Sequence, residues 1–250
     1  MFQGFYNLSS QMLTQNRSLN VISNNMANVS TAGFKSDRLI SSNFRNEIIS
    51  RIGNKEKSPV AIGKMSDIRS AVSTVTDYSG GGYAVSGNPF DMALTGDGFF
   101  VVQTPEGEVY TRNGSFSLDE EGYLMLPSVG RVMGENGPMK FDTDEFWVEE
   151  DGSIYRERDG SLLGRLRVVD FEDYNADLLK DGSNVFLRIG DAPTQVRPQI
   201  QWKAVEASNV NAVEEMTAMM SSQRALQSAA QVLKMYDQLT GKIVSQLGPT

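Results

Sequence analysis

Carboxylates are the side chains of this sequence whose type and position suggest chemistry. The 250-residue chain has no Cys and no His, which removes thiolate nucleophiles, the commonest general base and the usual zinc ligands. Asp91 and Asp97 could form an acid–base pair, and the run Asp119, Glu120 and Glu121 could bind a cation. Neither group has the spacing of a helix–loop–helix calcium site, and no nucleophile–base–orienter set accompanies them. We therefore predict no catalytic, cofactor-binding or metal-binding residues and expect these acids to form turns.

A run of three glycines is the other feature that could serve a ligand. Gly80–Gly82 precede Tyr83, Ala84 and Val85, without the third glycine of a dinucleotide-binding loop, and no phosphate-binding loop of the Walker type occurs. We interpret the run as a hinge or bulge. The sequence thus predicts neither a nucleotide cofactor nor a small-molecule substrate.

The charge balance argues against nucleic acid as a partner. The chain has 23 basic and 31 acidic residues, a net charge of −8, and no cluster of Lys and Arg. No segment approaches the roughly 18 apolar residues that span a bilayer, so we predict no membrane span. Polar residues interrupt the first thirty positions, so we expect a soluble protein and, for any export, a route without a cleaved signal peptide.

Both ends of the chain have apolar residues at the spacing of a coiled-coil seam, three and four residues apart. The N-terminal pattern predicts a helix from about Phe5 to Asn28, and the C-terminal pattern predicts a longer helix from an Asn cap at Asn209–Asn211 to a stop at Gly248–Pro249. The predicted N-terminal seam is Leu8, Met12, Leu19, Ile22 and Met26. The predicted C-terminal seam is Met219, Leu226, Leu233, Tyr236, Ile243 and Leu247, with weak positions at Ser222 and Thr240.

Neither seam is stable alone in water, because a helix gains most of its stability by packing its apolar face. One interpretation is a hairpin of the two terminal helices within one chain. The other is a bundle between chains, which the polar flanks of two long seams favour.

The middle of the chain predicts β structure. Turn sequences ending in Gly107, Gly122, Gly152 and Gly160 separate short runs of β-branched and aromatic residues, as in antiparallel hairpins. Residues 37–80 have few apolar residues and predict an extended connector, with a short helix near Phe44–Ile52 and a strand near Ile68–Val75.

The predicted fold class is α+β, with long N- and C-terminal coiled-coil helices flanking a central irregular all-β domain. We expect four parts: an N-terminal assembly helix and turn (1–36), the connector (37–80), the β domain (81–204) and a C-terminal assembly helix (205–250).

Three stretches carry a family resemblance. ISNNMANVSTAGFK at 22–35 resembles the N-terminal signature of bacterial flagellar rod and hook proteins, and VEASNVNAVEEMTAMMSSQRALQSAAQVLKMYDQ at 205–238 resembles their C-terminal signature. SGNPFDMALTGDGFFVVQTPEGEVYTRNGSFSLDEEGYL at 86–124 is similar to their shared central segment. The length leaves little room for the outer domains of hook proteins, so the chain resembles rod proteins of the FlgF or FlgG type.

The resemblance implies a structural role and no enzymatic activity. Subunits of this family stack helically into the axial drive shaft of the flagellum, which transmits torque from motor to hook, with the terminal helices in an inner tube. The implied location is the rod of the basal body, reached through the flagellar type III export apparatus. The implied partners are other copies of the chain and other rod proteins, with the hook protein and the export apparatus as further candidates.

The residues that match the two terminal signatures are the expected assembly residues. In the N-terminal signature they are Asn24, Asn25, Ala27, Asn28, Gly33 and Phe34. In the C-terminal signature they are Glu206, Ala207, Ser208, Asn209, Val210, Asn211, Glu214, Glu215, Gln223 and Arg224.

One segment departs from the resemblance. Residues 39–68 do not match the connector of distal-rod subunits, so proximal and distal positions both stay open. The alternative function is an oligomeric binding module outside the axial structure, whose β domain recognises peptidoglycan or a protein partner.

Overall fold

The chain forms two compact units, each described here by itself. The computed structural model describes residues 2–43, 46–51, 60–66, 69–142 and 145–247. The helical unit comprises residues 1–27, 37–75 and 211–250, and the β unit comprises 28–36 and 76–210. The four-part division remains a prediction. The structural grouping differs from it, because 28–36 and 205–210 are placed with the β strands and 37–75 with the helices.

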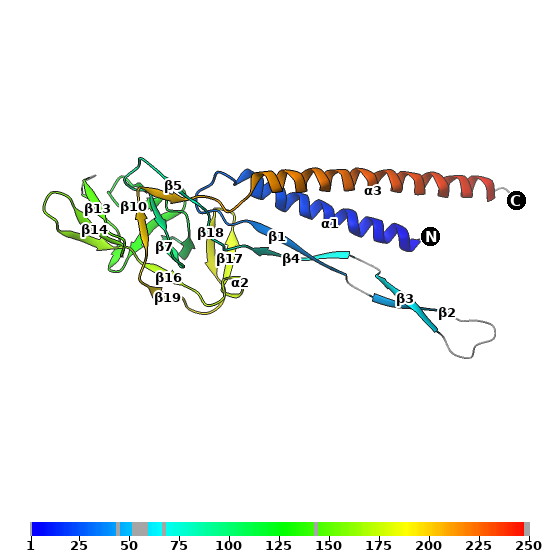
Figure 1. The fold of residues 1–250 in the computed structure, drawn as a ribbon, viewed down its shortest axis with the longest axis horizontal. Helices are drawn as coiled ribbons and strands as arrows, with labels where there is room; N and C mark the ends of the chain where they lie inside the picture. Colours follow the sequence, from blue (N-terminus) through cyan, green and yellow to red (C-terminus); the bar gives the residue numbers. More distant parts are fainter. Residues whose placement is uncertain (1, 44–45, 52–59, 67–68, 143–144, 248–250) are drawn as a thin grey trace. The chain divides into compact units, whose positions relative to one another are not determined.

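Two long helices dominate the helical unit. Helix α1 is Phe2–Ala27 and helix α3 is Ala212–Leu247, and they lie side by side (Figure 1). The Asn211 side chain accepts a hydrogen bond from the backbone N–H of Val213 at 3.1 Å, so it caps α3 as the sequence predicts. The prediction of N- and C-terminal helices flanking a β-rich region is confirmed.

Contacts at both ends of the pair show that α1 and α3 are antiparallel. Near the end of α1, Asn25 Nδ2 donates to Glu215 Oε1 at 2.8 Å. Near its start, a Cβ on Gly4 would lie 3.2 Å from the hydroxyl oxygen of Tyr236. The two contacts are separated by equal numbers of residues on the two helices, as an antiparallel register requires. The single chain therefore forms the antiparallel hairpin, and a bundle between chains stays a prediction.

Residues 37–76 form two strand pairs. Strand β1 (Asp37–Asn43) pairs with β4 (Arg69–Thr76), and β2 (Asn46–Arg51) pairs antiparallel with β3 (Val60–Ser66). The strand predicted near Ile68–Val75 is confirmed as β4, with Ile68 outside the described residues.

The short helix predicted near Phe44–Ile52 is wrong for residues 46–51, which form strand β2, and the rest of that prediction lies outside the described residues. Adjacent Ile48 and Ile49 are β-branched and favour extended backbone, and β3 pairs with β2 along its length. Pairing with a distant segment outweighs the local pattern that suggested a helix.

The β unit contains one large sheet and three small ones. The large sheet has the path β17-β18-β8-β7-β11-β10-β9, with β12, β16 and β19 joined to it. The small sheets are β13-β14-β15, β20-β6 and β21-β5. The bounds are β5 (Tyr83–Val85), β6 (Met92–Leu94), β7 (Phe99–Thr104), β8 (Gly107–Thr111), β9 (Ser117–Leu118), β10 (Leu124–Leu126), β11 (Gly130–Gly134), β12 (Gly137–Pro138), β13 (Phe146–Val148), β14 (Ser153–Arg156), β15 (Leu162–Arg165), β16 (Val168–Asp170), α2 (Tyr174–Asp177), β17 (Leu178–Asp181), β18 (Val185–Arg188), β19 (Thr194–Val196), β20 (Ile200–Trp202) and β21 (Ala204–Glu206).

Glycine turns connect these strands as the sequence predicts. Gly107, Gly122, Gly152 and Gly160 all have positive φ, between 64° and 144°, a conformation that glycine adopts without a Cβ penalty. The hairpin of β7 and β8 closes with Thr104 opposite Gly107. The prediction of short antiparallel strands joined by these turns is confirmed.

Strand β7 separates two apolar clusters. Phe100 and Val102 belong to the larger cluster, whereas Phe99 and Val101 belong to a second cluster with Tyr110. Successive side chains of a strand point to opposite faces, so β7 is covered on both. These clusters form the core of the β unit.

Candidate assembly site

Two of the acidic residues considered for chemistry, Asp119 and Asp91, are a turn former and a structural partner in the structure. The Asp119 carboxylate accepts backbone N–H bonds from Glu121 and Tyr123 at 2.9 and 2.8 Å, and it pairs with Arg131 at 2.7 Å. Asp91 is buried and accepts from the Ser86 hydroxyl at 2.5 Å. Among the described residues no group of three acids is placed to hold a metal ion.

The predicted seam positions of α1 face inward within the helical unit. Ile22 is buried at 8% exposure, and the other four predicted seam residues are half-buried. By contrast Leu13, which the seam excludes, is 60% exposed. All five predicted seam residues of α1 are therefore at least partly buried in the single chain, and their role as a seam stays a prediction.

The predicted seam of α3 gives the same result over most of its length. Met219, Leu226, Leu233 and Tyr236 are half-buried, whereas Ile243 is 40% exposed. The Leu247 side chain lies outside the described residues. Ser222, a weak position in the apolar pattern, is the most buried described residue of α3. The predicted seam of α3 is thus half-buried over most of its described length, and its most buried position is a small polar residue.

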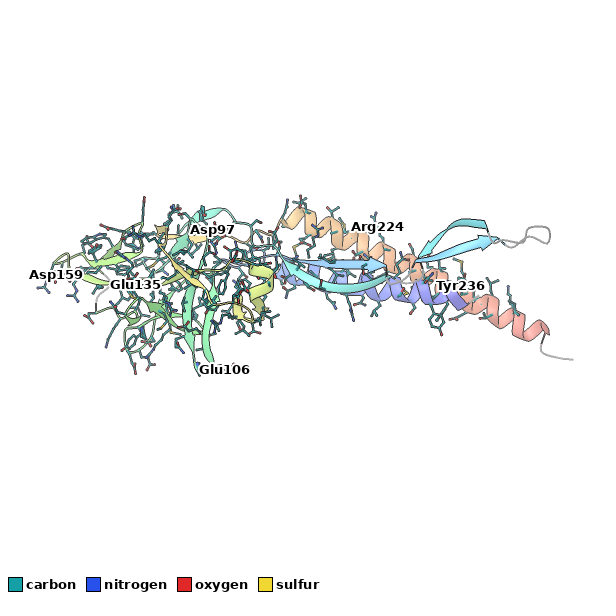
Figure 2. The ribbon with its side chains drawn as sticks, turned by 90° about the horizontal axis from the view of Figure 1, so that it is seen from below. Asp97, Glu106, Glu135, Asp159, Arg224 and Tyr236 are labelled. Carbon is teal, nitrogen blue, oxygen red and sulfur yellow. The ribbon has the colours of Figure 1, made fainter. Side chains whose placement is uncertain are left out.

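Many large apolar side chains of the two helices are exposed in the single chain. Figure 2 shows Tyr236 and Arg224 on α3, among side chains that project from the helix pair. The exposed large apolar residues of α1 and α3 are Phe5, Tyr6, Leu13, Val213, Met216, Met220, Val232, Met235, Leu239 and Ile243. Surface patches of this kind mark interaction sites.

The buried side-chain amide of Asn25 joins the end of α1 to the start of α3. The Asn25 side chain, 1% exposed, accepts from the Asp37 backbone N–H at 2.9 Å and donates to the Asp37 carbonyl at 2.8 Å. It also donates to the Glu215 carboxylate at 2.8 Å. Asn25 of the N-terminal signature is therefore bonded to Glu215 of the C-terminal signature. Asn25 is also bonded to Asp37, the first residue of β1.

The turn after α1 requires glycine. Gly33 has φ +66°, and a Cβ there would lie 2.4 Å from the backbone of Arg112, far closer than van der Waals contact. Phe34 is 3% exposed, and the Lys180 ammonium lies 3.8 Å from the centre of its ring. The left-handed conformation of Gly33 and the close backbone approach within the β unit thus both exclude a larger residue.

The C-terminal signature contributes a buried ion pair. Glu206 and Lys35 are each 1% exposed, and Lys35 Nζ lies 2.6 Å from Glu206 Oε1. Arg112, 5% exposed, has a guanidinium nitrogen 3.7 Å from Glu206 Oε2. Burial lowers the pKa of Lys35, and the hydrogen bond to Glu206 opposes that shift.

Asn209 links the two signatures by a second route. Its Oδ1 accepts from the Ser36 backbone N–H at 2.7 Å, and its Nδ2 donates to the Asp77 carbonyl at 2.9 Å. Ala207 donates its backbone N–H to the Gly82 carbonyl at 2.7 Å. The structure therefore brings 33–36, 77–82 and 206–209 together in the β unit, and the glycine run is a site of close backbone packing.

The remaining predicted assembly residues do not join these clusters. Asn24, Ala27, Asn211, Glu214, Gln223 and Arg224 are exposed, and Asn28, Ser208 and Val210 are half-buried. Asn28 accepts from the Thr31 hydroxyl at 3.2 Å in the turn after α1, and the Ser208 hydroxyl accepts from the Val210 N–H at 3.3 Å. Their role in assembly stays a prediction.

Sequence reasoning missed the two buried cations, Lys35 and Arg112. Each follows a stretch with turn or strand character, and neither has a charged neighbour in the sequence. The available signal was a single Lys after Gly33 and Phe34, with Glu206 near the start of the C-terminal signature. Complementary charges in two signatures that meet in space would have suggested the pair.

Comparison with known proteins places these features in a family. Residues 5–35 match the family described as flagella basal body rod protein, 93–156 match the flagellar hook protein FlgE/F/G D1 domain, and 203–247 match the flagellar basal body rod FlgEFG protein C-terminal family. The three regions contain α1 and its turn, the centre of the β unit, and the C-terminal signature with α3.

Full-length relatives agree with these matches. The flagellar basal-body rod protein FlgG of Buchnera aphidicola is 31% identical over 93% of this chain and 95% of its own length. FlgG of Bacillus subtilis is 30% identical over 98% and 99%, and FlgF of Caulobacter vibrioides is 31% identical over 96% and 95%. The chain belongs to the family of flagellar basal-body rod proteins. This is a family of structural proteins located in the flagellar basal body, and the chain is a structural rod subunit.

The helices that the structure describes include none with the length and hydropathy of a membrane span.

Proposed function

We propose that the chain polymerises helically through its terminal helices into the axial shaft of the flagellar rod, which transmits torque from motor to hook. Its partners in this proposal are further copies of itself, other rod proteins, the hook protein and the export apparatus. The proposal rests on family membership and on one structural observation, the exposed apolar surface of the helix pair.

The helix pair lacks an apolar core of its own. Ile22 is the one buried hydrophobic residue that the described parts of α1 and α3 contain. Ten large apolar residues of the same helices are exposed. Because long helices depend on packing of an apolar face, neighbouring subunits would supply the burial that a single chain lacks. The coiled-coil character predicted for the seams belongs to this assembled state.

A repeated asymmetric contact is sufficient to make a shaft. When one patch of a subunit binds a different patch of the next, and the rotation between them does not close a ring, the product is a helical filament. Exposed Leu13 of α1 and exposed Met216 of α3 belong to different helices and are candidates for the two patches.

Export would leave α1 intact in this proposal. Helix α1 starts at Phe2 and pairs with α3, so cleavage of a leader within this segment would remove an assembly element. We propose secretion by the flagellar export apparatus without such cleavage.

A charge on the exposed helix surface tests the assembly step. Leu239→Asp replaces a side chain that is 58% exposed, so the subunit itself should fold normally, whereas a buried unpaired charge in an interface should block incorporation. Gln238→Asp is the matched control at the neighbouring exposed position. Incorporation is measured by mass spectrometry of purified hook-basal bodies. Normal incorporation of Leu239→Asp contradicts a role for this surface.

Deletion of the chain in its own cells tests the function directly. The rod proposal predicts basal bodies with truncated rods by electron microscopy, and the subunit present in stoichiometric amount in wild-type basal bodies. Intact basal bodies in the deletion strain would contradict the proposal and favour a binding module outside the axial structure.

A further inference from the structure

Two segments of the β unit, far apart in the sequence, are held together by buried polar contacts. Residues 28–36 and 204–210, here called the two straps, meet at the ion pair of Lys35 and Glu206. We propose that this pair is a latch: it holds both straps on the β unit, and when it breaks the straps open together while the large sheet stays folded. This inference concerns the single chain and does not depend on rod assembly.

The latch consists of several bonds that converge on one carboxylate. Lys35 Nζ donates to Glu206 Oε1 at 2.6 Å and to the Ser79 carbonyl at 2.8 Å. The Gly81 backbone N–H donates to the same Oε1 at 3.1 Å. The backbone of Glu206 takes part as well, because its carbonyl accepts from the Gly33 N–H at 2.7 Å. Loss of the Glu206 side chain would therefore remove bonds to two segments at once, at Lys35 and at Gly81.

Two side chains of the large sheet anchor the first strap. Lys180 of β17 donates to the Lys35 carbonyl at 2.5 Å and lies over the Phe34 ring. Asn184, which precedes β18, donates from Nδ2 to the Ala32 carbonyl at 3.0 Å. These anchors are also polar or charged, with Phe34 as the apolar contribution.

The straps lie outside the apolar core of the β unit. Phe34 and Ala204 are buried, but among the described residues neither apolar cluster includes a strap residue. Strand β21, which holds Glu206, pairs with β5 in a two-stranded sheet separate from the large one. Hydrophobic burial accordingly stabilises the sheet, whereas polar contacts hold the straps.

Removal of one partner of such a contact is more destabilising than replacement of both partners. Breaking one partner of a buried ion pair leaves an uncompensated charge, which destabilises far more than the pair itself stabilises. Without Glu206, Lys35 would remain buried near the Arg112 guanidinium with no carboxylate between them. In the described structure Arg112 Nε and Glu206 Oε2 lack hydrogen-bond partners, so the network is only partly satisfied and is costly to keep closed.

Opening of the latch would affect the chain on both sides of the β unit. The first strap follows α1 directly, and the second precedes α3 by one residue. The latch therefore holds both straps, which are the segments that connect the long helices to the β strands.

Hydrogen exchange of the full chain tests the latch. Glu206→Gln should accelerate exchange in 28–36, 77–82 and 204–210 together by about 100-fold, with less than about 3-fold change in β7 and β8. Glu108→Gln is the matched control: it breaks a half-exposed pair with Arg167 at 2.8 Å in the same unit and should change exchange in the straps by less than about 2-fold.

Rescue separates a latch from general destabilisation. The double variant Lys35→Met and Glu206→Leu replaces the pair by apolar side chains, and strap exchange should return to within about 10-fold of wild type. Equal acceleration of the straps and of β7 and β8 in Glu206→Gln would overturn the proposal, as would unchanged exchange in the straps.

A milder variant covers the case in which Glu206→Gln fails to fold. Asn184 has φ +58°, which glycine accepts, so Asn184→Gly removes the bond to Ala32 without backbone strain. The substitution touches the first strap alone, yet a latch predicts faster exchange in both straps by a similar factor. Acceleration confined to 28–36 would contradict joint opening.

Discussion

The helical unit and the β unit bury their apolar residues in opposite ways. Every buried hydrophobic residue of the described chain except Ile22 belongs to the β unit, whereas the long helices expose residues as apolar as Leu13 and Leu239. The β unit therefore has a core within one chain, whereas in the proposed rod the neighbouring subunits would cover the exposed helix surfaces. The comparison teaches that two units of one chain can differ in how much apolar surface each buries by itself.

The largest expected effect comes from a substitution in the apolar core of the β unit. Phe100→Ala removes a fully buried ring that packs edge-on against Phe116 with centroids 5.1 Å apart. We expect a loss of about 3–5 kcal/mol in the free energy of unfolding. Both tryptophans, Trp147 and Trp202, lie in the β unit, so urea unfolding followed by Trp fluorescence reports this unit. A loss below about 1 kcal/mol would contradict a self-sufficient core.

The second effect concerns the turn after α1. Gly33→Ala adds a Cβ at φ +66°, 2.4 Å from the Arg112 backbone, and should cost roughly 1–3 kcal/mol. The Trp fluorescence transition should shift to lower urea. Gly182→Ala is the control, because nothing lies within 4 Å of a Cβ at that position, and its transition should stay unchanged.

The third effect is specific to the helical unit. Asn25→Ala leaves the Asp37 backbone groups and Glu215 without the buried amide that bonds them, and should destabilise the helix pair by about 1–2 kcal/mol. Circular dichroism at the helical minimum should show earlier thermal loss of helix. The Trp fluorescence transition should move less than the helical signal. Equal shifts of both signals would mean that the two units unfold as one.

The smallest effect comes from turn acids on the β unit. The Ser153 backbone N–H and the Arg165 guanidinium lower the pKa of Asp151 below its ordinary 3.8. A carboxylate whose pKa is lower in the folded state stabilises above the unfolded pKa, and this contribution is lost as pH falls through the folded value. The urea midpoint of the β unit should hold from pH 7 to about 5 and decline below about 4. Asp151→Asn should flatten that decline, and an unaltered pH profile in the variant would contradict the assignment.

Local patterns predicted the long elements well. The three- and four-residue spacing of apolar residues predicted both terminal helices, because helix geometry repeats over short distances. Turn glycines such as Gly122 and Gly160 located hairpins, because positive φ is a local requirement. Strand β2 was missed because its conformation depends on pairing with β3. Propensities calculated over a short stretch of sequence do not include such pairing.

The candidate site was predicted in part. The terminal signatures pointed to Asn25, Gly33 and Glu206, but the reason for each lies in a distant partner: Glu215, the Arg112 backbone and Lys35. Long-range polar pairs leave no periodic trace in a sequence, since each partner looks like an ordinary surface residue in its own context. The exposed apolar residues could not be told from core residues before the structure showed what covers each face.

The unequal lengths of the two helices have a consequence for the handling of the free subunit. Helix α1 starts at Phe2, and its Gly4 lies against Tyr236, so α3 runs on to Leu247 for about 16 Å past that contact. An unsupported helix end frays readily. A protease added to the purified subunit would therefore cleave the chain first near this end, starting at exposed Lys242. The order in which the cleavage products appear would show which part of α3 is protected by its contact with α1.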